Sequence, residues 1–185
     1  ADKHLYYYNL GWLKNKQQKP DEAIRWYKKS VTQKPSYPDA YNNLGYIYDR
    51  QGKKDSAVYW YKQCLKADPD YTRAMHNLAY IYNDIYKYDS SLYYYKMLYH
   101  LVPLNASVAY EIGLSYYYSY DYDSSIVYLE RALTLNNKNA DYYAKAGDAY
   151  FDGAPDKINK TAYYQKAIDY YSGALHLDST LYLSM

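Results

Sequence analysis

Apolar residues between positions 40 and 49 recur at the spacing of an α-helix rather than of a strand. They stand at Ala40, Tyr41, Leu44, Gly45, Ile47 and Tyr48, so one side of the segment is apolar. Gly52 interrupts this pattern, and a second apolar stripe follows at Ala57, Val58, Trp60, Tyr61, Cys64 and Leu65. We expect Asp55 to cap the second helix and Asp68-Pro69-Asp70 to end it. Residues 38–71 are therefore predicted to form a pair of helices.

The same pattern recurs every 34 residues along the chain. Small residues stand at Gly11, Gly45, Ala79, Gly113 and Gly147, aspartates at Asp21, Asp55, Asp89 and Asp123, prolines at Pro35, Pro69 and Pro103, and tyrosines at Tyr48, Tyr82, Tyr116 and Tyr150. A fixed period shared by several residue types identifies a repeat array. One pair of short helices cannot bury its apolar face alone, so neighbouring pairs must stack.

The period and its residues also resemble a known family. The series Tyr41, Leu44, Gly45, Tyr48, Ala57, Tyr61 and Pro69 is similar to the tetratricopeptide pattern of an aromatic, Leu-Gly, an aromatic, then Ala, an aromatic and Pro. The resemblance implies an all-α, right-handed superhelical solenoid of stacked antiparallel helix pairs. Its five repeats would span 4–37, 38–71, 72–105, 106–139 and 140–181. Departures from the pattern are modest and fall at Ser91, Ser125, Leu129, Asn137 and Ser179.

The fifth repeat departs more. Ala167 follows Gly147 by 20 residues, whereas Ala57 follows Gly45 by 12, so eight residues are inserted. We expect the second helix of this repeat to begin early. Residues 182–185 are expected to start a further, truncated helix that leaves apolar surface exposed, so that the chain is cut from a longer one or self-associates.

The resemblance implies that the first helix of each repeat lines a concave groove. The candidate peptide-binding set is Tyr8, Asn9, Trp12, Asn42, Asn43, Tyr46, Arg73, His76, Asn77, Tyr80, Tyr110 and Glu111. Within it, Asn9, Asn43 and Asn77 form a ladder whose amides can donate to and accept from a peptide backbone. We expect the loss of the Asn43 and Asn77 side chains to weaken binding and to leave the fold intact. The alternative is that asparagine is simply common at this repeat position.

The expected charge of the groove argues against an acidic ligand. The resemblance places five acids (Asp39, Asp49, Glu111, Asp141, Asp148) and two bases (Arg73, Lys145) at groove positions, a net charge of −3. Some members of the family hold an acidic peptide in a clamp of Lys, Asn and Arg. Here only half of the clamp is present, because Tyr8 and Trp12 stand where it has a lysine and an asparagine. We therefore expect a neutral to mildly basic protein or peptide partner.

Charge is also graded along the array. Repeat one carries seven Lys or Arg against two Asp or Glu, and repeats four and five are each net −2. Ends of opposite sign favour contact between copies through the array ends. The basic residues of repeat one lie off the expected groove, so nucleic acid is not an expected partner.

Tyrosine is unusually frequent, with 34 residues against one phenylalanine. In one interpretation tyrosine replaces phenylalanine as the wedge between helices, with its hydroxyl reaching water at the rim. In the other, some of the tyrosines line the groove and contact a ligand. The single cysteine, Cys64, stands at a small second-helix position and is expected to be a packed thiol.

The sequence predicts an interaction scaffold that binds an extended peptide or a partner helix. The alternative is a structural spacer or oligomerisation segment of a larger assembly protein. We do not expect an enzyme, a cofactor or a metal site, because the four histidines are far apart in the repeat order and no catalytic or phosphate-binding motif occurs.

No apolar run approaches the roughly 20 residues of a membrane-spanning helix. No secretory signal is visible, but the chain begins with Ala-Asp-Lys, and we expect it to be part of a longer protein. The compartment stays open between the cytoplasm and, if a signal was removed, the periplasm or envelope.

Overall fold

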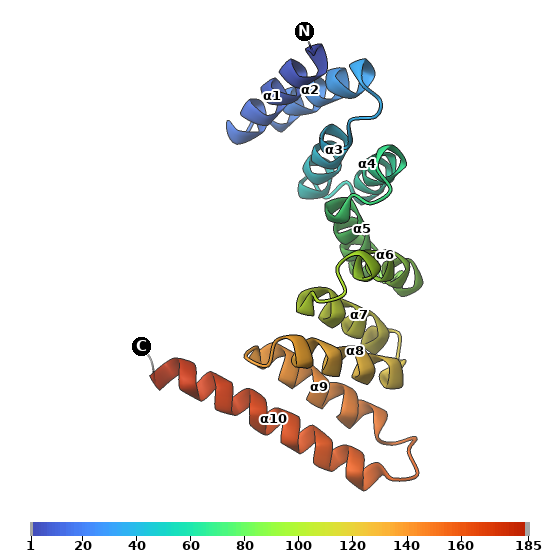
Figure 1. The fold of residues 1–185 in the computed structure, drawn as a ribbon, viewed down its shortest axis with the longest axis vertical. Coiled ribbons are helices and arrows are strands. Elements are labelled where there is room, and N and C mark those ends of the chain that lie inside the picture. Colours follow the sequence, from blue (N-terminus) through green and yellow to red (C-terminus); the bar gives the residue numbers. More distant parts are fainter. Residues whose placement is uncertain (1, 184–185) are drawn as a thin grey trace. The chain divides into compact units, whose positions relative to one another are not determined.

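The computed structural model describes residues 2–183, with side chains described as far as Asp178, and this part of the chain is helical throughout (Figure 1). The chain divides into an N-terminal unit that ends at Ile85 and a C-terminal unit that begins at Tyr86. The N-terminal unit contains α1 (Lys3–Lys16), α2 (Pro20–Gln33), α3 (Pro38–Arg50), α4 (Lys54–Ala67) and α5 (Thr72–Asp84). The C-terminal unit contains α6 (Tyr88–Leu101), α7 (Ala106–Tyr118), α8 (Tyr122–Leu135), α9 (Ala140–Gly153) and α10 (Lys160–Leu183). The predicted all-α class of antiparallel helix pairs is confirmed.

The small repeat position lets the two helices of a pair approach closely in the N-terminal unit. A Cβ atom at Gly11 would lie 2.8 Å from the ring of Tyr27, and one at Gly45 would lie 2.7 Å from the ring of Tyr61. Both rings are fully buried. Each tyrosine is therefore a wedge that fits only against a residue without a side chain, or with a very small one.

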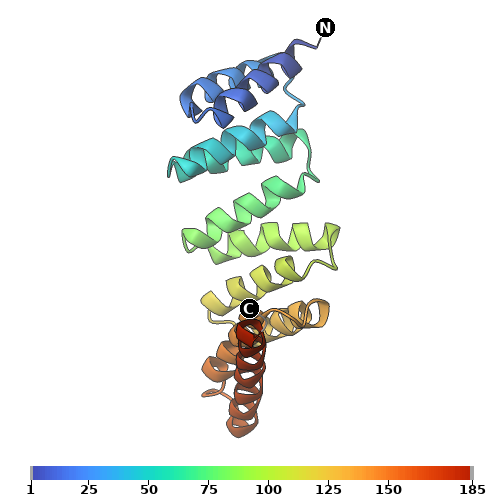
Figure 2. The same ribbon diagram turned by 90° about the vertical axis from the view of Figure 1, so that its left-hand side faces the viewer.

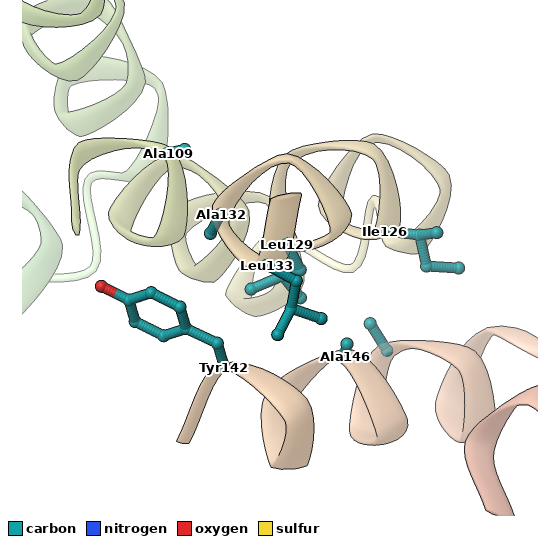
Figure 3. Close-up of a cluster of buried hydrophobic side chains, with 8 residues drawn as sticks. Ala109, Ile126, Leu129, Ala132, Leu133, Tyr142 and Ala146 are labelled. Atoms are coloured by element: carbon teal, nitrogen blue, oxygen red, sulfur yellow. The ribbon is translucent and has the colours of Figure 1, made fainter. Parts of the chain in front are cut away.

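The core of the C-terminal unit lies around α8, between α7 and α9 (Figure 3). Leu129 takes the wedge position, where a Cβ atom at Gly113 would approach its Cγ to 2.7 Å. Leu129 and Leu133 point from α8 toward Ala146 and Tyr142 of α9 (Figure 3). The sequence departure at Leu129 thus preserves the packing role of the tyrosines in other repeats.

The turns inside the helix pairs share an unusual backbone conformation. Gln18, Gly52, Tyr86 and Tyr120 follow one another at 34-residue intervals, and their φ angles are 58°, 74°, 59° and 64°. This left-handed conformation costs a residue with a side chain roughly 1–2 kcal/mol, and glycine adopts it freely. Only the second of these turns uses glycine.

The expected role of Asp55 as a helix cap is wrong. The cap position of α4 is Lys53, and Asp55 lies inside the first turn of the helix. The freed backbone groups are satisfied within the turn, where the Lys53 N–H donates to the Tyr48 carbonyl at 2.9 Å. Asp55 instead places a negative charge near the positive end of the helix dipole.

The insertion in the fifth repeat is shared between loop and helix. The loop between α9 and α10 has six residues, and that between α3 and α4 has three. The second helix also begins earlier, because α10 starts seven residues before Ala167, whereas α4 starts three residues before Ala57. The further helix and the exposed apolar surface expected at 182–185 lie outside the residues whose side chains are described.

Candidate functional site

A groove of about 940 Å³ opens on the N-terminal unit. It is lined mainly by α1, α3 and α5 and by the turns that follow α1 and α3, and Pro20 and Tyr27 of α2 complete the lining. Seven residues of the candidate set lie in its lining: Trp12, Asn42, Asn43, Tyr46, Arg73, His76 and Asn77. First helices of three successive repeats therefore contribute to one concave surface.

The other candidate residues have different surroundings. Tyr8 lies against the ring of Tyr27 at a centroid distance of 5.6 Å, and Asn9 and Tyr80 are exposed. Tyr110 and Glu111 belong to the C-terminal unit. There the ring of Tyr110 stacks on that of Tyr142, with ring centroids 4.6 Å apart, and packs against the core of that unit.

Asn43 of the ladder is hydrogen-bonded to a tyrosine wedge. The Asn43 Nδ2 donates to the hydroxyl of Tyr27 at 3.1 Å, and it also lies 3.3 Å from the hydroxyl of Tyr8. One repeat later, the Asn77 Nδ2 donates to the Oδ1 of Asn42 at 3.5 Å. The Asn43 amide therefore satisfies the polar end of a fully buried ring from the preceding helix.

Other residues stand at the ladder position in the last two repeats. At the next repeat the hydroxyl of Tyr95 donates to Glu111 at 3.3 Å. In the repeat after that, Leu129 has no hydroxyl, and Lys145 pairs with Asp148 at 2.6 Å. The expectation that Asn43 has no part in the fold is thus corrected, because its amide binds the buried phenol of Tyr27, which separates the helices.

The sequence analysis missed part of the groove lining. Lys16, Gln18, Arg50 and Gln51 stand at the carboxyl ends of α1 and α3 and in the following turns. A signal was available, because Lys16 and Arg50 occupy last-turn positions, where cations are favoured by the helix dipole.

The charge of this groove differs from that expected for the whole array. Three permanent cations line it, Lys16, Arg50 and Arg73, and no carboxylate does so among the described residues. The two nearest acids of the predicted set have partners outside the lining: Asp49 binds Lys54 at 2.8 Å, and Asp39 accepts from Tyr71 at 2.7 Å. This local charge favours an acidic segment, the opposite of the preference expected from the sum over five repeats.

Many tyrosine hydroxyls find partners inside the protein. The Oε1 of Glu130 accepts from both Tyr150 and Tyr170, each at 2.8 Å, and this carboxylate joins α8 to α9 and α10. In α9, Asp148 accepts from Tyr171 at 2.8 Å. Burial raises the pKa of Tyr37 to about 12 and raises the pKa values of Tyr27 and Tyr61 further. Tyrosine thus replaces phenylalanine where the ring must pack and the hydroxyl can bind a neighbouring helix.

Cys64 is fully buried in α4 and its Sγ lies 3.3 Å from the carbonyl oxygen of Pro38, to which the thiol donates. Burial raises the pKa of this thiol to about 12, so it is protonated near neutral pH. Among residues 2–183 no three His, Cys, Asp or Glu side chains come together as metal ligands. Nor is any helix in that part of the chain both long enough and apolar enough to cross a membrane.

Comparison with known proteins identifies the repeats. A family model described as TPR repeat matches residues 13–52, and two described as tetratricopeptide repeat match residues 38–71 and 106–139. No curated protein matches the sequence.

Solved structures of MamA share the fold at low sequence identity. MamA 41-end from Desulfovibrio magneticus RS-1 aligns with a TM-score of 0.82 and 19% identity over 97% of both chains. A crystal structure of MamA protein aligns with a TM-score of 0.83 and 21% identity over 96% of this chain and 93% of that one. These identities establish similarity of fold alone.

Proposed function

Because this chain belongs to the tetratricopeptide repeat family, whose repeats mediate protein–protein interaction, we propose that it is a binding module whose N-terminal groove holds an extended segment of a partner protein. The observation that carries the proposal is the composition of the lining. Two exposed aromatic rings, Trp12 and Tyr46, and three cations meet there with six side-chain amides: Asn15, Gln18, Asn42, Asn43, Gln51 and Asn77.

Trp12 and Tyr46 supply the apolar contacts. Each is 46% exposed, and neither forms part of the buried core of the unit. Large aromatic side chains that are exposed in a concave surface are the usual anchors of a protein interface. A partner side chain that covers either ring would bury apolar area at no cost to the fold.

The amides and cations give the groove its preference. Side-chain amides can donate to carbonyl groups and accept from N–H groups of an extended backbone, largely independently of the partner's sequence. Arg50 and Arg73 add charge-assisted hydrogen bonds to any carboxylate on the segment. We therefore propose an extended partner segment that carries Asp or Glu, in place of the neutral to mildly basic one expected from the sequence.

Selection of decapeptides on the immobilised wild-type chain tests the proposal. The enriched peptides should carry acidic residues, and their dissociation constants should be measured by calorimetry. In the double variant Trp12→Ala/Tyr46→Ala we expect binding to weaken about tenfold or more, because two anchors are lost. The variant should keep the wild-type melting temperature, since both rings are exposed.

Tyr59→Ala is the matched control. Tyr59 is 54% exposed, but it lies on α4 and outside the groove lining. The control should bind the selected peptides like the wild type. If the double variant binds the peptides as tightly as the wild type, the peptides bind elsewhere. If the selected peptides lack acidic residues, the proposed charge preference is wrong, although the groove can still be the site.

An assembly role is the second candidate, and the charges of the two units favour it. Residues 1–85 carry fourteen Lys or Arg and nine Asp or Glu, a net of +5, whereas residues 86–185 carry eight and eleven, a net of −3. Opposite signs favour association between copies. Light scattering should then show a mass that rises with protein concentration and falls with added salt, and a constant monomer mass would reject this role.

A further inference from the structure

Five tyrosines form a continuous strip along one edge of the C-terminal unit. The members of this tyrosine strip are Tyr86, Tyr88, Tyr118, Tyr120 and Tyr122. Ring centroids lie 6.4 Å apart for Tyr86 and Tyr88, 6.2 Å for Tyr88 and Tyr118, and 6.4 Å for Tyr120 and Tyr122. Tyr117 bridges the two halves, 5.4 Å from Tyr118 and 5.6 Å from Tyr122. Tyr88 and Tyr122 are the first residues of α6 and α8, and these two helices begin on the same side of the unit (Figure 2).

The repeat does not need aromatic residues at these positions. Where the C-terminal unit has Tyr86 and Tyr120, the N-terminal unit has Gln18 and Gly52 in turns of the same left-handed conformation. Positions equivalent to Tyr88 and Tyr122 hold Pro20 and Lys54, and Arg50 stands at the position of Tyr118. The strip is therefore an addition to the fold rather than a requirement of it.

Two members of the strip are strained and almost fully exposed. Tyr86 and Tyr120 have φ angles of 59° and 64°, and each is 79% exposed. Glycine would adopt this conformation without strain, and a side chain that is so exposed contributes little to packing. Strained residues that bring the fold no benefit concentrate at binding sites.

The surroundings of the strip indicate the charge of its occupant. Asp89 and Asp121 follow two of its tyrosines in the sequence, and both are exposed. Asp123 is exposed as well, but it is already paired with Lys157 at 2.5 Å. In the N-terminal unit lysines already cover aromatic faces, as Lys29 does over Trp26 at 4.5 Å. Within the described residues no Lys or Arg lies over a ring of the strip. Tyr88 and Tyr118 stack on each other, whereas the highly exposed rings of Tyr86 and Tyr120 are open to a cation from outside.

We propose that the tyrosine strip binds an extended, Arg- or Lys-bearing segment of a partner protein. Cationic side chains lie over the open ring faces, and the neighbouring carboxylates of Asp89 and Asp121 attract the same charges. This surface is separate from the N-terminal groove and has the opposite charge preference, so the proposal does not rest on the groove function.

Glycine substitution separates binding from folding at this surface. The probe is a decapeptide of alternating Arg and Gly, with Gln–Gly and Glu–Gly peptides of the same length for comparison. We expect the Arg–Gly peptide to bind the wild-type chain more tightly than either of the others, and more weakly as salt is added. In Tyr86→Gly/Tyr120→Gly its dissociation constant should rise about fivefold or more, because two cation–π contacts are lost. The melting temperature should be equal to that of the wild type or higher.

Tyr93→Ala is the control, because Tyr93 is 59% exposed on α6 but is not a member of the strip. It should leave peptide binding unchanged. Equal binding of the Gln–Gly peptide, or retained binding in the double glycine variant, would overturn the proposal. A lower melting temperature of that variant would assign the tyrosines to the fold. If instead the wild type self-associates in the absence of peptide and the double glycine variant does not, a second copy of the chain is the occupant. That result would overturn the partner proposed here.

Discussion

The side-chain amide of Asn43 donates a hydrogen bond to the hydroxyl of Tyr27, at 3.1 Å, and so ties α3 to α2. Tyr27 is fully buried, and its hydroxyl would lie without a partner if the amide were removed. A residue pattern that suggested ligand binding therefore also stabilises the stack.

Asn43→Ala should lower the free energy of unfolding by about 2 kcal/mol, because the phenols of Tyr27 and Tyr8 lose a donor in a partly buried site. Chemical denaturation measures the change. Adding Tyr27→Phe to this variant should recover part of the loss, since the buried hydroxyl is then absent. Asn9→Ala is the control, because Asn9 is exposed, and it should change the stability by less than about 0.5 kcal/mol. Equal stabilities of the two single variants would contradict the structural role.

Gly45→Ala should destabilise the chain by about 1–2 kcal/mol. The added Cβ atom would lie 2.7 Å from the buried ring of Tyr61, which cannot move without opening the helix pair. Gly52→Asn should be nearly neutral by comparison. Gly52 has open space around it and a φ of 74°, which asparagine adopts at little cost. Thermal unfolding of the two variants distinguishes a glycine needed for space from one needed for its conformation, and similar losses would refute the distinction.

Glu130→Ala should cost about 2 kcal/mol, because the hydroxyls of Tyr150 and Tyr170 share its carboxylate as their acceptor. Glu130→Gln keeps an acceptor oxygen and should lose only about half as much. Thr134→Ala, an exposed change on the same helix, should stay within about 0.5 kcal/mol of the wild type. If Glu130→Ala unfolds at the same denaturant concentration as Thr134→Ala, the carboxylate does not hold α8 to α9 and α10.

The chain should lose stability in alkaline solution. Burial raises the pKa values of Tyr27 and Tyr61, while an unfolded phenol ionises near pH 10. The folded chain therefore binds more protons than the unfolded chain above about pH 10. Its stabilisation is complete below that pH and is lost as the pH rises through the folded pKa values. Melting temperatures measured between about pH 8 and pH 11 should be constant at first and then fall, and Tyr61→Phe should reduce the slope. A constant melting temperature up to pH 11 would contradict this reasoning.

Local rules anticipated the turns only in part. The 34-residue spacing of Gly52 with Tyr86 and Tyr120 did not suggest a shared left-handed conformation, because tyrosine is an uncommon residue there. Asp55 recurs at a position typical of a helix cap. In the structure, however, the cap position is Lys53, whose N–H donates to the Tyr48 carbonyl, and the Asp55 carboxylate lies inside the first turn of the helix. In both places the backbone path depends on how the two helices pack, and local propensity is a weaker influence.

The sequence by itself determined the helices, their pairing and the repeat family, because these depend on the spacing of apolar residues and on small residues opposite large ones such as Gly45 and Tyr61. It also predicted seven of the residues that line the groove, because they lie on the first helices of their repeats. Only the tertiary structure decided which polar groups are already bound. The pairing of Asp49 with Lys54 and of Asp39 with Tyr71 leaves a groove lined by cations, and the bond between Asn43 and Tyr27 gives a groove residue a role in stability. The physical reason is that a hydrogen bond or ion pair depends on distances of a few ångströms between side chains far apart in the sequence, whereas a helix depends on residues three and four apart.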